Sequence, residues 1–202
     1  MRLIQNLAAG VAVVWGGAFA PVAMCQEPKQ ATKESKESPA PKSMEISLAG
    51  GKIKMMSPEG WEQKKPRFPQ MIKYEYAIPA GAKEGEPTAR ITFSAAGGSV
   101  DANIKRWKSQ FEKLDKKSEV TKFQASKQTV HWADLRGSFK DTMGAPPFAG
   151  RPPKIREGYR MLGAIIETKE SGLQFVKVIG PAAVVDKYAE GTKKMLKELK
   201  SK

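Results

Sequence analysis

The chain has 202 residues, 40% of them apolar and 28% charged, which suits one folded domain with appended segments. Its formal net charge of +14 favours anionic partners, with a basic surface that only maintains solubility as the equal alternative. The single cysteine, Cys25, excludes a disulfide within the chain and a cysteine-based metal site. Beyond residue 25, no apolar run approaches the roughly 20 residues of a membrane-spanning helix.

Residues 1–25 have the pattern of a secretory signal peptide. Arg2 gives a positive start, and the apolar run over residues 7–20 is rich in small side chains and too short to span a membrane. Cleavage after Cys25 is one expectation. The alternative is a lipoprotein in which Cys25 becomes the lipidated first residue, although Met24 is large for the position before such a cysteine. Either way, we expect an exported protein that is periplasmic, extracellular or envelope-associated.

Residues 26–43 contain Lys, Glu, Ser and Pro but no large apolar side chain. This composition is typical of a disordered linker of mixed charge, because it offers nothing to bury in a core. Patterned apolar residues begin at Met44 and continue almost to the end of the chain. We therefore expect a single folded domain over residues 44–202, without internal repeats.

The first part of this domain is predicted to be β structure. A hairpin is expected from strands at 44–48 and 52–56, and the basic, proline-containing segment 63–69 is predicted to be a loop. Strands are predicted at 72–78 and 88–96, because apolar and polar residues alternate there. The second of these strands has the clearest alternation in the chain, with its polar side chains facing outward.

The clearest helix is predicted from Ser99 to Leu114. Its apolar side chains recur at helical spacing and form one stripe, made of Val100, Ile104, Trp107, Phe111 and Leu114. The hydroxyl of Ser99 is expected to cap the first free amides of the helix. Because aromatic rings occupy the middle of the stripe, we expect Trp107 and Phe111 to lie in the interior of the protein.

The second half of the domain is predicted to contain four strands and a helix. The strands are expected at 119–125, 129–140, 159–168 and 173–179, and the helix at 182–199. The last two strands are apolar on both faces, which is typical of central strands in a sheet covered on both sides. Short turns between strands favour antiparallel pairing. The fold class predicted is α+β, with a mostly antiparallel sheet sandwiched between helices.

The usual catalytic patterns are not found. His131, the single histidine, lies on a predicted strand, and alternation places Asp134 and Ser138 on the opposite face, so we do not expect a catalytic triad. No acidic or histidine cluster has metal-ligand spacing. Gly97-Gly98-Ser99 precedes a helix but lacks the lysine and spacing of a nucleotide-binding loop. We therefore expect no enzyme activity, no metal and no cofactor.

The strongest candidate for binding is the long segment 141–158, predicted to be a loop with four prolines. Prolines restrain a loop, so less ordering entropy is lost on binding, and arginine forks suit oxyanions. The candidate residues for a partner or an anion are Phe148, Arg151, Lys154, Arg156 and Arg160. The alternative is an arm that packs across the sheet edge, with its arginines merely solvated.

Three runs of residues, 97–111, 158–166 and 175–181, resemble a family of small exported bacterial proteins of unassigned activity. That family in turn resembles the PsbP-like fold, shared by the extrinsic PsbP subunit of photosystem II and a Ran-binding nuclear import factor. The resemblance covers residues 44–199 and implies an antiparallel sheet between helices. It also implies action by binding partners rather than by catalysis, and it transfers no active site. Gly191-Thr192 departs from the apolar pattern expected midway along the last helix.

These observations predict an exported, non-catalytic binding or assembly module that acts through protein–protein contacts. Its partner is expected to be a protein of the cell envelope. The alternative function is the binding of an anionic polymer or a membrane surface through the basic face of the domain. Nucleic acid is not expected as a physiological ligand, because a signal peptide removes the protein from the cytoplasm.

Overall fold

The structure is a computed structural model that describes residues 43–142 and 152–202. The chain divides into two units, 1–37 and 38–202, and all described residues belong to the second. The predicted signal peptide and all but the last residue of the predicted linker lie outside the described residues. Neither helix of the described part combines the length and the apolar character needed to cross a bilayer.

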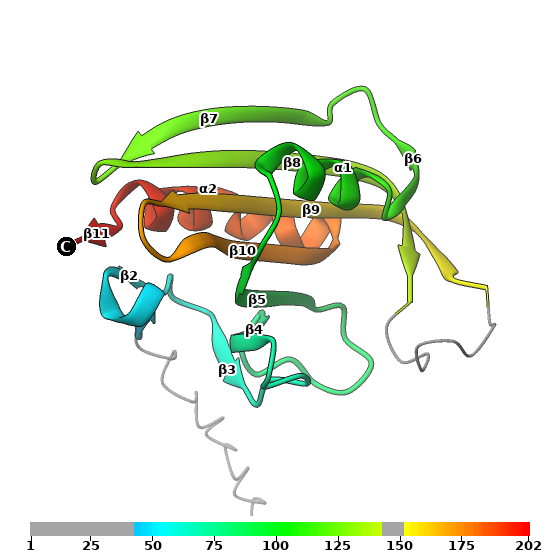
Figure 1. The fold of residues 1–202 in the computed structure, drawn as a ribbon. Coiled ribbons are helices and arrows are strands. Elements are labelled where there is room, and N and C mark those ends of the chain that lie inside the picture. The colour runs from blue at the N-terminus through cyan, green and yellow to red at the C-terminus, as the bar shows by residue number, and fades with distance from the viewer. Residues whose placement is uncertain (1–42, 143–151) are drawn as a thin grey trace, which may run out of the picture. The chain divides into compact units, whose positions relative to one another are not determined.

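Most of the described strands form one sheet, in which every recorded pairing is antiparallel (Figure 1). In spatial order its strands are β3 (Glu62–Lys64), β4 (Ile72–Ile78), β5 (Ala89–Ala96), β10 (Gly172–Pro181), β9 (Lys154–Thr168), β8 (Gln128–Asp141) and β6 (Phe111–Leu114), and β7 (Glu119–Ala125) also pairs with β8. The prediction of a mostly antiparallel sheet is confirmed. The short strand β3 lies at the start of the segment predicted to be a loop.

The predicted first hairpin is confirmed, but it belongs to a separate small sheet. Strands β1 (Glu45–Leu48) and β2 (Ile53–Met56) are joined by a 3-10 turn, η1 (Ala49–Gly51), and β2 also pairs with β11 (Lys200–Ser201). The described part of the chain therefore begins and ends in the same small sheet, on either side of β2. A two-residue strand such as β11 carries too little sequence pattern to be predicted.

The helix that follows β5 is shorter than predicted. Helix α1 spans Val100–Lys108, and the predicted cap is confirmed because Ser99 Oγ accepts a hydrogen bond from the backbone N–H of Ala102 at 3.2 Å. The predicted continuation to Leu114 was wrong, since β6 already begins at Phe111 and pairs with β8. A four-residue spacing from Trp107 to Phe111 fits a continuing helix, but it also fits a chain that leaves the helix and returns to the same apolar layer.

The last helix, α2 (Ala182–Lys197), is confirmed, and its packing resolves the unusual Gly191-Thr192 pair. Thr192 is fully buried, and its hydroxyl donates to the backbone carbonyl of Tyr188 at 2.8 Å. A side chain of this kind meets its hydrogen-bonding need inside its own helix, so it can occupy an apolar position. At Gly191, a Cβ atom would meet Pro58 at 3.5 Å, an ordinary contact distance.

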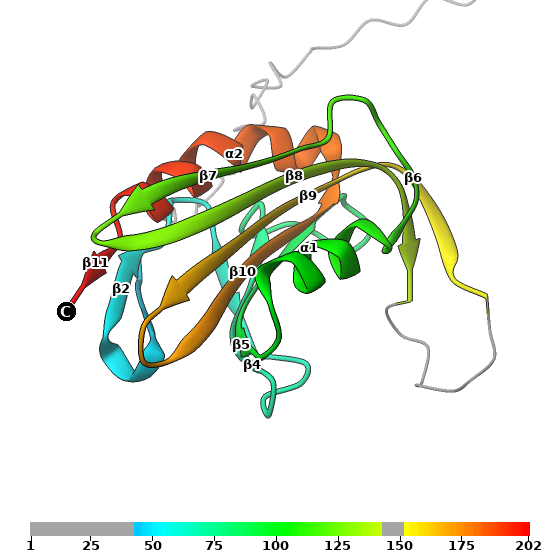
Figure 2. The same cartoon turned by 45° about the horizontal axis from the view of Figure 1, so that its top comes forward.

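Two apolar clusters lie on opposite faces of the main sheet. On β9, Met161 and Ile165 pack with Trp107 of α1, whereas Leu162 and Ile166 belong to the cluster that includes the buried residues of α2. Residues alternate between the faces of a strand, so α1 and α2 contact different faces, as Figure 2 shows on the two sides of β9 and β10. The prediction that Trp107 lies in the interior is confirmed, since it is 3% exposed.

The long loop predicted over residues 141–158 is shorter in the structure. Strand β8 continues to Asp141 and β9 begins at Lys154, and these two residues are register partners. The residues from Lys154 to Gly158 therefore extend the central strand pair instead of lying in a loop. The prolines and charged residues that predicted a loop there are compatible with the exposed end of a strand. At such an end, the backbone groups that do not pair with the neighbouring strand can form hydrogen bonds with water.

Candidate functional site

Neither helix of the described residues covers one part of the main sheet, and this part is the candidate binding surface. We call it the open face: the side of β4, β5 and β10 that lies beside α1. On β5, Ile91 and Phe93 belong to the cluster under α2, so Thr92 between them points to the open face. The residues placed there by the same alternation are Glu75 of β4, Arg90, Thr92 and Ser94 of β5, and Lys177 of β10. Lys73 lies at a shift of the β4–β5 register, between Ile72 and Tyr74, so alternation does not assign it to a face.

The open face is polar and carries a half-buried ion pair at its centre. Arg90 donates to both carboxylate oxygens of Glu75, from Nε at 2.7 Å and from Nη2 at 2.9 Å. The hydrogen bonds from Arg90 hold the pKa of Glu75 below its ordinary value, against the opposing effect of burial. A planar two-point pair of this kind fixes both side chains, so it gives this part of the sheet a rigid polar surface.

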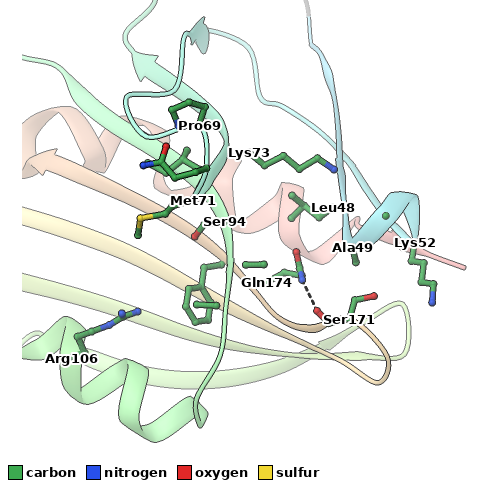
Figure 3. Close-up of a pocket in the computed structure, with 16 residues that line it drawn as sticks. Leu48, Ala49, Lys52, Pro69, Met71, Lys73, Ser94, Arg106, Ser171 and Gln174 are labelled. Carbon is green, nitrogen blue, oxygen red and sulfur yellow. Dashed lines mark hydrogen bonds between the residues drawn. The ribbon is translucent and has the colours of Figure 1, made fainter.

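A groove of about 830 Å³ lies at one end of the open face, between α1 and the tip of the first hairpin. Figure 3 shows Arg106 and Met71 on one side of the groove and Lys52 and Ala49 on the other. Its cations are Lys52, Lys73 and Arg106, and none of the described residues that line it is acidic. Lys52 forms an exposed ion pair with Glu170.

Exposed apolar side chains lie at and beside this groove. Met71 lines it and is 69% exposed, and Phe68, three residues earlier in the β3–β4 connection, is 48% exposed. The connection is fixed by the N–H groups of Met71 and Ile72, which both donate to the carbonyl of Phe68, at 2.9 and 2.8 Å. Methionine, phenylalanine and arginine, all present at or beside this groove, are enriched in protein interfaces.

Of the five residues predicted from the loop, three lie in the described part of the chain, and these three have different surroundings. Phe148 and Arg151 lie outside the described residues. Lys154 is exposed at the start of β9, while Arg156 Nε donates to a carboxylate oxygen of Asp141 at 3.1 Å.

Arg160 is the exception among these candidates, because it is buried. It is 8% exposed, and its guanidinium donates to both carboxylate oxygens of Asp134 and, at 2.7 Å, to Asp186 of α2. Burial works to lower the pKa of Arg160, but the hydrogen bonds to the two carboxylates outweigh it and raise the pKa. These contacts join α2 to the sheet and use three of the five N–H donors of the guanidinium within the domain.

The side chains considered for a catalytic triad have separate partners. His131 Nε2 lies 3.2 Å from a carboxylate oxygen of Glu167, Asp134 is bound by Arg160, and Ser138 donates to Glu157 at 2.6 Å. Within residues 43–142 and 152–202, no three His, Cys, Asp or Glu side chains gather into a group that could hold a metal ion.

Sequence reasoning did not single out the open face, although one signal for it was present. The prediction that the polar residues of β5 face outward is confirmed by the half-buried positions of Arg90, Thr92 and Ser94. Since β5 is an interior strand of the sheet, a fully polar face on it indicates a surface that no helix covers. No comparable signal marks Met71, whose exposure depends on the turn that presents it.

Comparison with protein-family models and with curated proteins finds no match to this chain. Among solved structures, it is similar to cyanobacterial PsbP (CyanoP) from Synechocystis sp. PCC 6803, with 10% identity, a TM-score of 0.48, and coverage of 79% of this chain and 92% of that chain. It is also similar to the Ran-binding protein Mog1p from Saccharomyces cerevisiae, with 11% identity, a TM-score of 0.36, and coverage of 77% and 85%. Both structures are of the kind named in the resemblance drawn from the sequence, and the similarity says nothing about function.

Proposed function

We propose that the protein is a non-catalytic binding module of the PsbP-like sandwich type, and that its open face binds an acidic surface of a protein partner. The groove beside Met71 is the observation that carries this proposal. An exposed apolar side chain on an ordered turn is flanked there by cations, with no acidic residue among the described residues that line the groove. A partner that fits this groove offers an apolar pocket for Met71 and carboxylates around it.

The separation between structural and surface charges supports the proposal. The buried arginine, Arg160, is bound by two carboxylates, whereas Lys73 at the groove is exposed and lies 5.5 Å from the ring centre of Tyr74. Cations of the second kind contribute little to folding, because exposed charges are well solvated. Their grouping around an apolar anchor therefore has a simpler explanation in recognition than in stability.

Site-specific cross-linking tests this function. A photo-reactive amino acid replaces Met71 in the full chain, and the matched control replaces Val120, which is 38% exposed on β7 and far from the groove in sequence and sheet order. We expect one defined protein adduct from position 71, absent from position 120, that persists at moderate salt. The same adducts from both positions, or none from position 71, would contradict the proposal.

The alternative, an anionic polymer or membrane surface, has a different signature. Binding through dispersed cations falls steeply with salt and does not depend on one apolar anchor. Retention on anionic vesicles or polyanions that is lost in moderate salt and unaffected by Met71→Ala would favour that alternative over a protein partner.

The predicted loop and the predicted export are part of the proposal. We propose that Arg151 and Arg156 extend the binding surface, so replacing both with Ala should reduce the adduct from position 71; an unchanged yield removes the loop from the interface.

We also propose that residues 1–25 are removed on export. Mass spectrometry of the mature protein tests this, because it distinguishes simple cleavage, a lipid on Cys25 and an intact N-terminus.

A further inference from the structure

A second hollow lies at the other end of the open face, where β5 and β10 pass the turn that follows α1. Its volume is about 340 Å³. Three cations line it, Arg90, Lys140 and Lys177, together with neutral hydrogen-bonding side chains that include Thr92 and Gln110. None of the described residues that line this cationic pocket is acidic.

Lys177 is the central group of the cationic pocket. It lies between Phe175 and Ile179 on β10, two residues of the cluster under α1, and is therefore held at the margin of an apolar layer. Its ammonium donates to Gln110 Oε1 at 2.5 Å, and within the described residues no carboxylate lies at ion-pair distance from it. Burial lowers the pKa of Lys177 to about 8, and the charges of Arg90 and Arg106 act in the same direction. The group still carries its proton at pH 7.

The two other cations add to this positive potential. Arg90 of β5 is paired with Glu75 of β4, whereas Lys177 lies on β10, on the other side of β5. The carboxylate of Glu75 is therefore already occupied by Arg90. Lys140 is half-buried, and its backbone N–H donates to the carbonyl of Gln110 at 2.8 Å, which fixes the end of β8 against the turn after α1. The pocket is thus built on hydrogen-bonded backbone and keeps one partly desolvated ammonium without a counter-charge.

We propose that the cationic pocket binds a small oxyanion, the group that phosphate, sulfate and carboxylate ligands share. A partly buried charge that is satisfied by one neutral acceptor is unfavourable by itself, and an anion supplies the missing charge-assisted hydrogen bonds. Hydroxyl and amide side chains in the lining can complete the coordination of such a ligand. This site goes beyond the proposed function, since a free anion can occupy it without any protein partner.

Titration of the full chain with sodium phosphate, sodium sulfate and sodium acetate tests the inference. Ionic strength is held constant with sodium chloride at pH 7, and binding is followed by the chemical shifts of backbone amides. We expect saturable binding of at least one anion to the wild type, weakened about tenfold in Lys177→Met. Because that change removes an uncompensated cation, the variant is expected to fold. Lys140→Gln gives a second variant on a different strand and should weaken binding severalfold.

The matched control is Lys187→Gln, which removes the same charge from an exposed position on α2. We expect it to bind anions as the wild type does. Binding of phosphate and sulfate without acetate assigns the site to tetrahedral anions, and the opposite result assigns it to carboxylates. The inference is overturned if no anion binds saturably, if Lys177→Met binds as the wild type does, or if Lys187→Gln loses as much affinity as Lys177→Met.

Discussion

The covered region of the sheet, formed by β8 and β9 between the two helices, and the open face each contain an arginine paired with a carboxylate, but they differ at Lys177. In the covered region Arg160 is bound by two carboxylates, and β9 is buried over seven consecutive residues. On the open face Lys177 is half-buried with a neutral acceptor only. A paired buried cation serves the fold, while an uncompensated one is a liability for stability that is best explained by a ligand.

The largest effect should follow from breaking the charge pairing of the covered region. Arg160→Met leaves the half-buried carboxylate of Asp134 with only its longer contact to Arg136, at 3.7 Å. We expect the free energy of unfolding to fall by about 3 kcal/mol, the usual cost of leaving a buried charge without its partner. Urea denaturation measures it, with Arg156→Met as the control for a more exposed pair. A loss below about 1 kcal/mol would remove the distinction between the two regions.

A smaller loss is expected from the tight packing of α1 on the sheet. At Gly163 of β9, a Cβ atom would lie 2.3 Å from the indole ring of Trp107, which is itself fixed against Phe175. Gly163→Ala should therefore destabilise the protein by about 2 kcal/mol, because the helix or the ring must move away. Thermal unfolding checks the change, and near-ultraviolet circular dichroism should report an altered environment of Trp107. Unchanged stability would show that α1 is held loosely.

These packing effects indicate which features the sequence could predict. Alternation along β5 and the double-sided apolar pattern of β9 predicted strands and their burial, because each side chain there reports directly on the face it occupies. The end of α1 was not predictable, since Phe111 satisfies the helical spacing and the strand equally well. The pairing of Arg160 with Asp134 joins residues 26 positions apart, and it depends on the register between β8 and β9.

The open face could be predicted from the sequence only in part. Its polar residues were placed correctly as outward-facing, but the sequence does not say that α1 stops short of covering them. The hydrogen bond from Lys177 to Gln110 joins residues that are 67 positions apart in the chain. Charge composition alone therefore directed attention to the loop arginines rather than to this lysine.

The partly buried charge of Lys177 predicts that the stability of the protein depends on pH. Its pKa is about 8 in the folded protein and near the ordinary value of 10.5 in the unfolded chain. Between these values the unfolded chain binds more protons, so the stability of the wild type should rise with pH across this window.

Lys177→Met should abolish this rise, which we expect to amount to about 2 kcal/mol after allowing for partial solvent screening. Urea denaturation of both proteins at pH 7.5 and pH 10.5 measures it. The groups that face Lys177 are Arg90, Arg106 and Gln110, with Glu75 and Lys140 beyond them, and all are retained in the variant. Parallel pH profiles would contradict the burial of this charge.

The smallest effect is expected at Gly191, where α2 is not tightly packed. At Gly191 of α2 the nearest atom to a new Cβ is 3.5 Å away, on Pro58. Gly191→Ala should stabilise the protein by about 0.5–1 kcal/mol, because alanine loses less conformational entropy in a helix. Thermal unfolding checks it, and a loss of stability would show that Pro58 and α2 are closer than this distance implies.

The open face as a binding surface is tested most directly by the affinity for the protein that cross-links through position 71. Lys73→Glu on β4 and Lys122→Glu on β7 reverse the same charge on exposed strand positions, one beside the groove and one away from it. We predict that Lys73→Glu weakens this affinity at least tenfold, while Lys122→Glu changes it less than twofold and both variants keep the unfolding midpoint of the wild type. Equal losses in the two variants would assign binding to the overall basic charge and would contradict a specific surface beside α1.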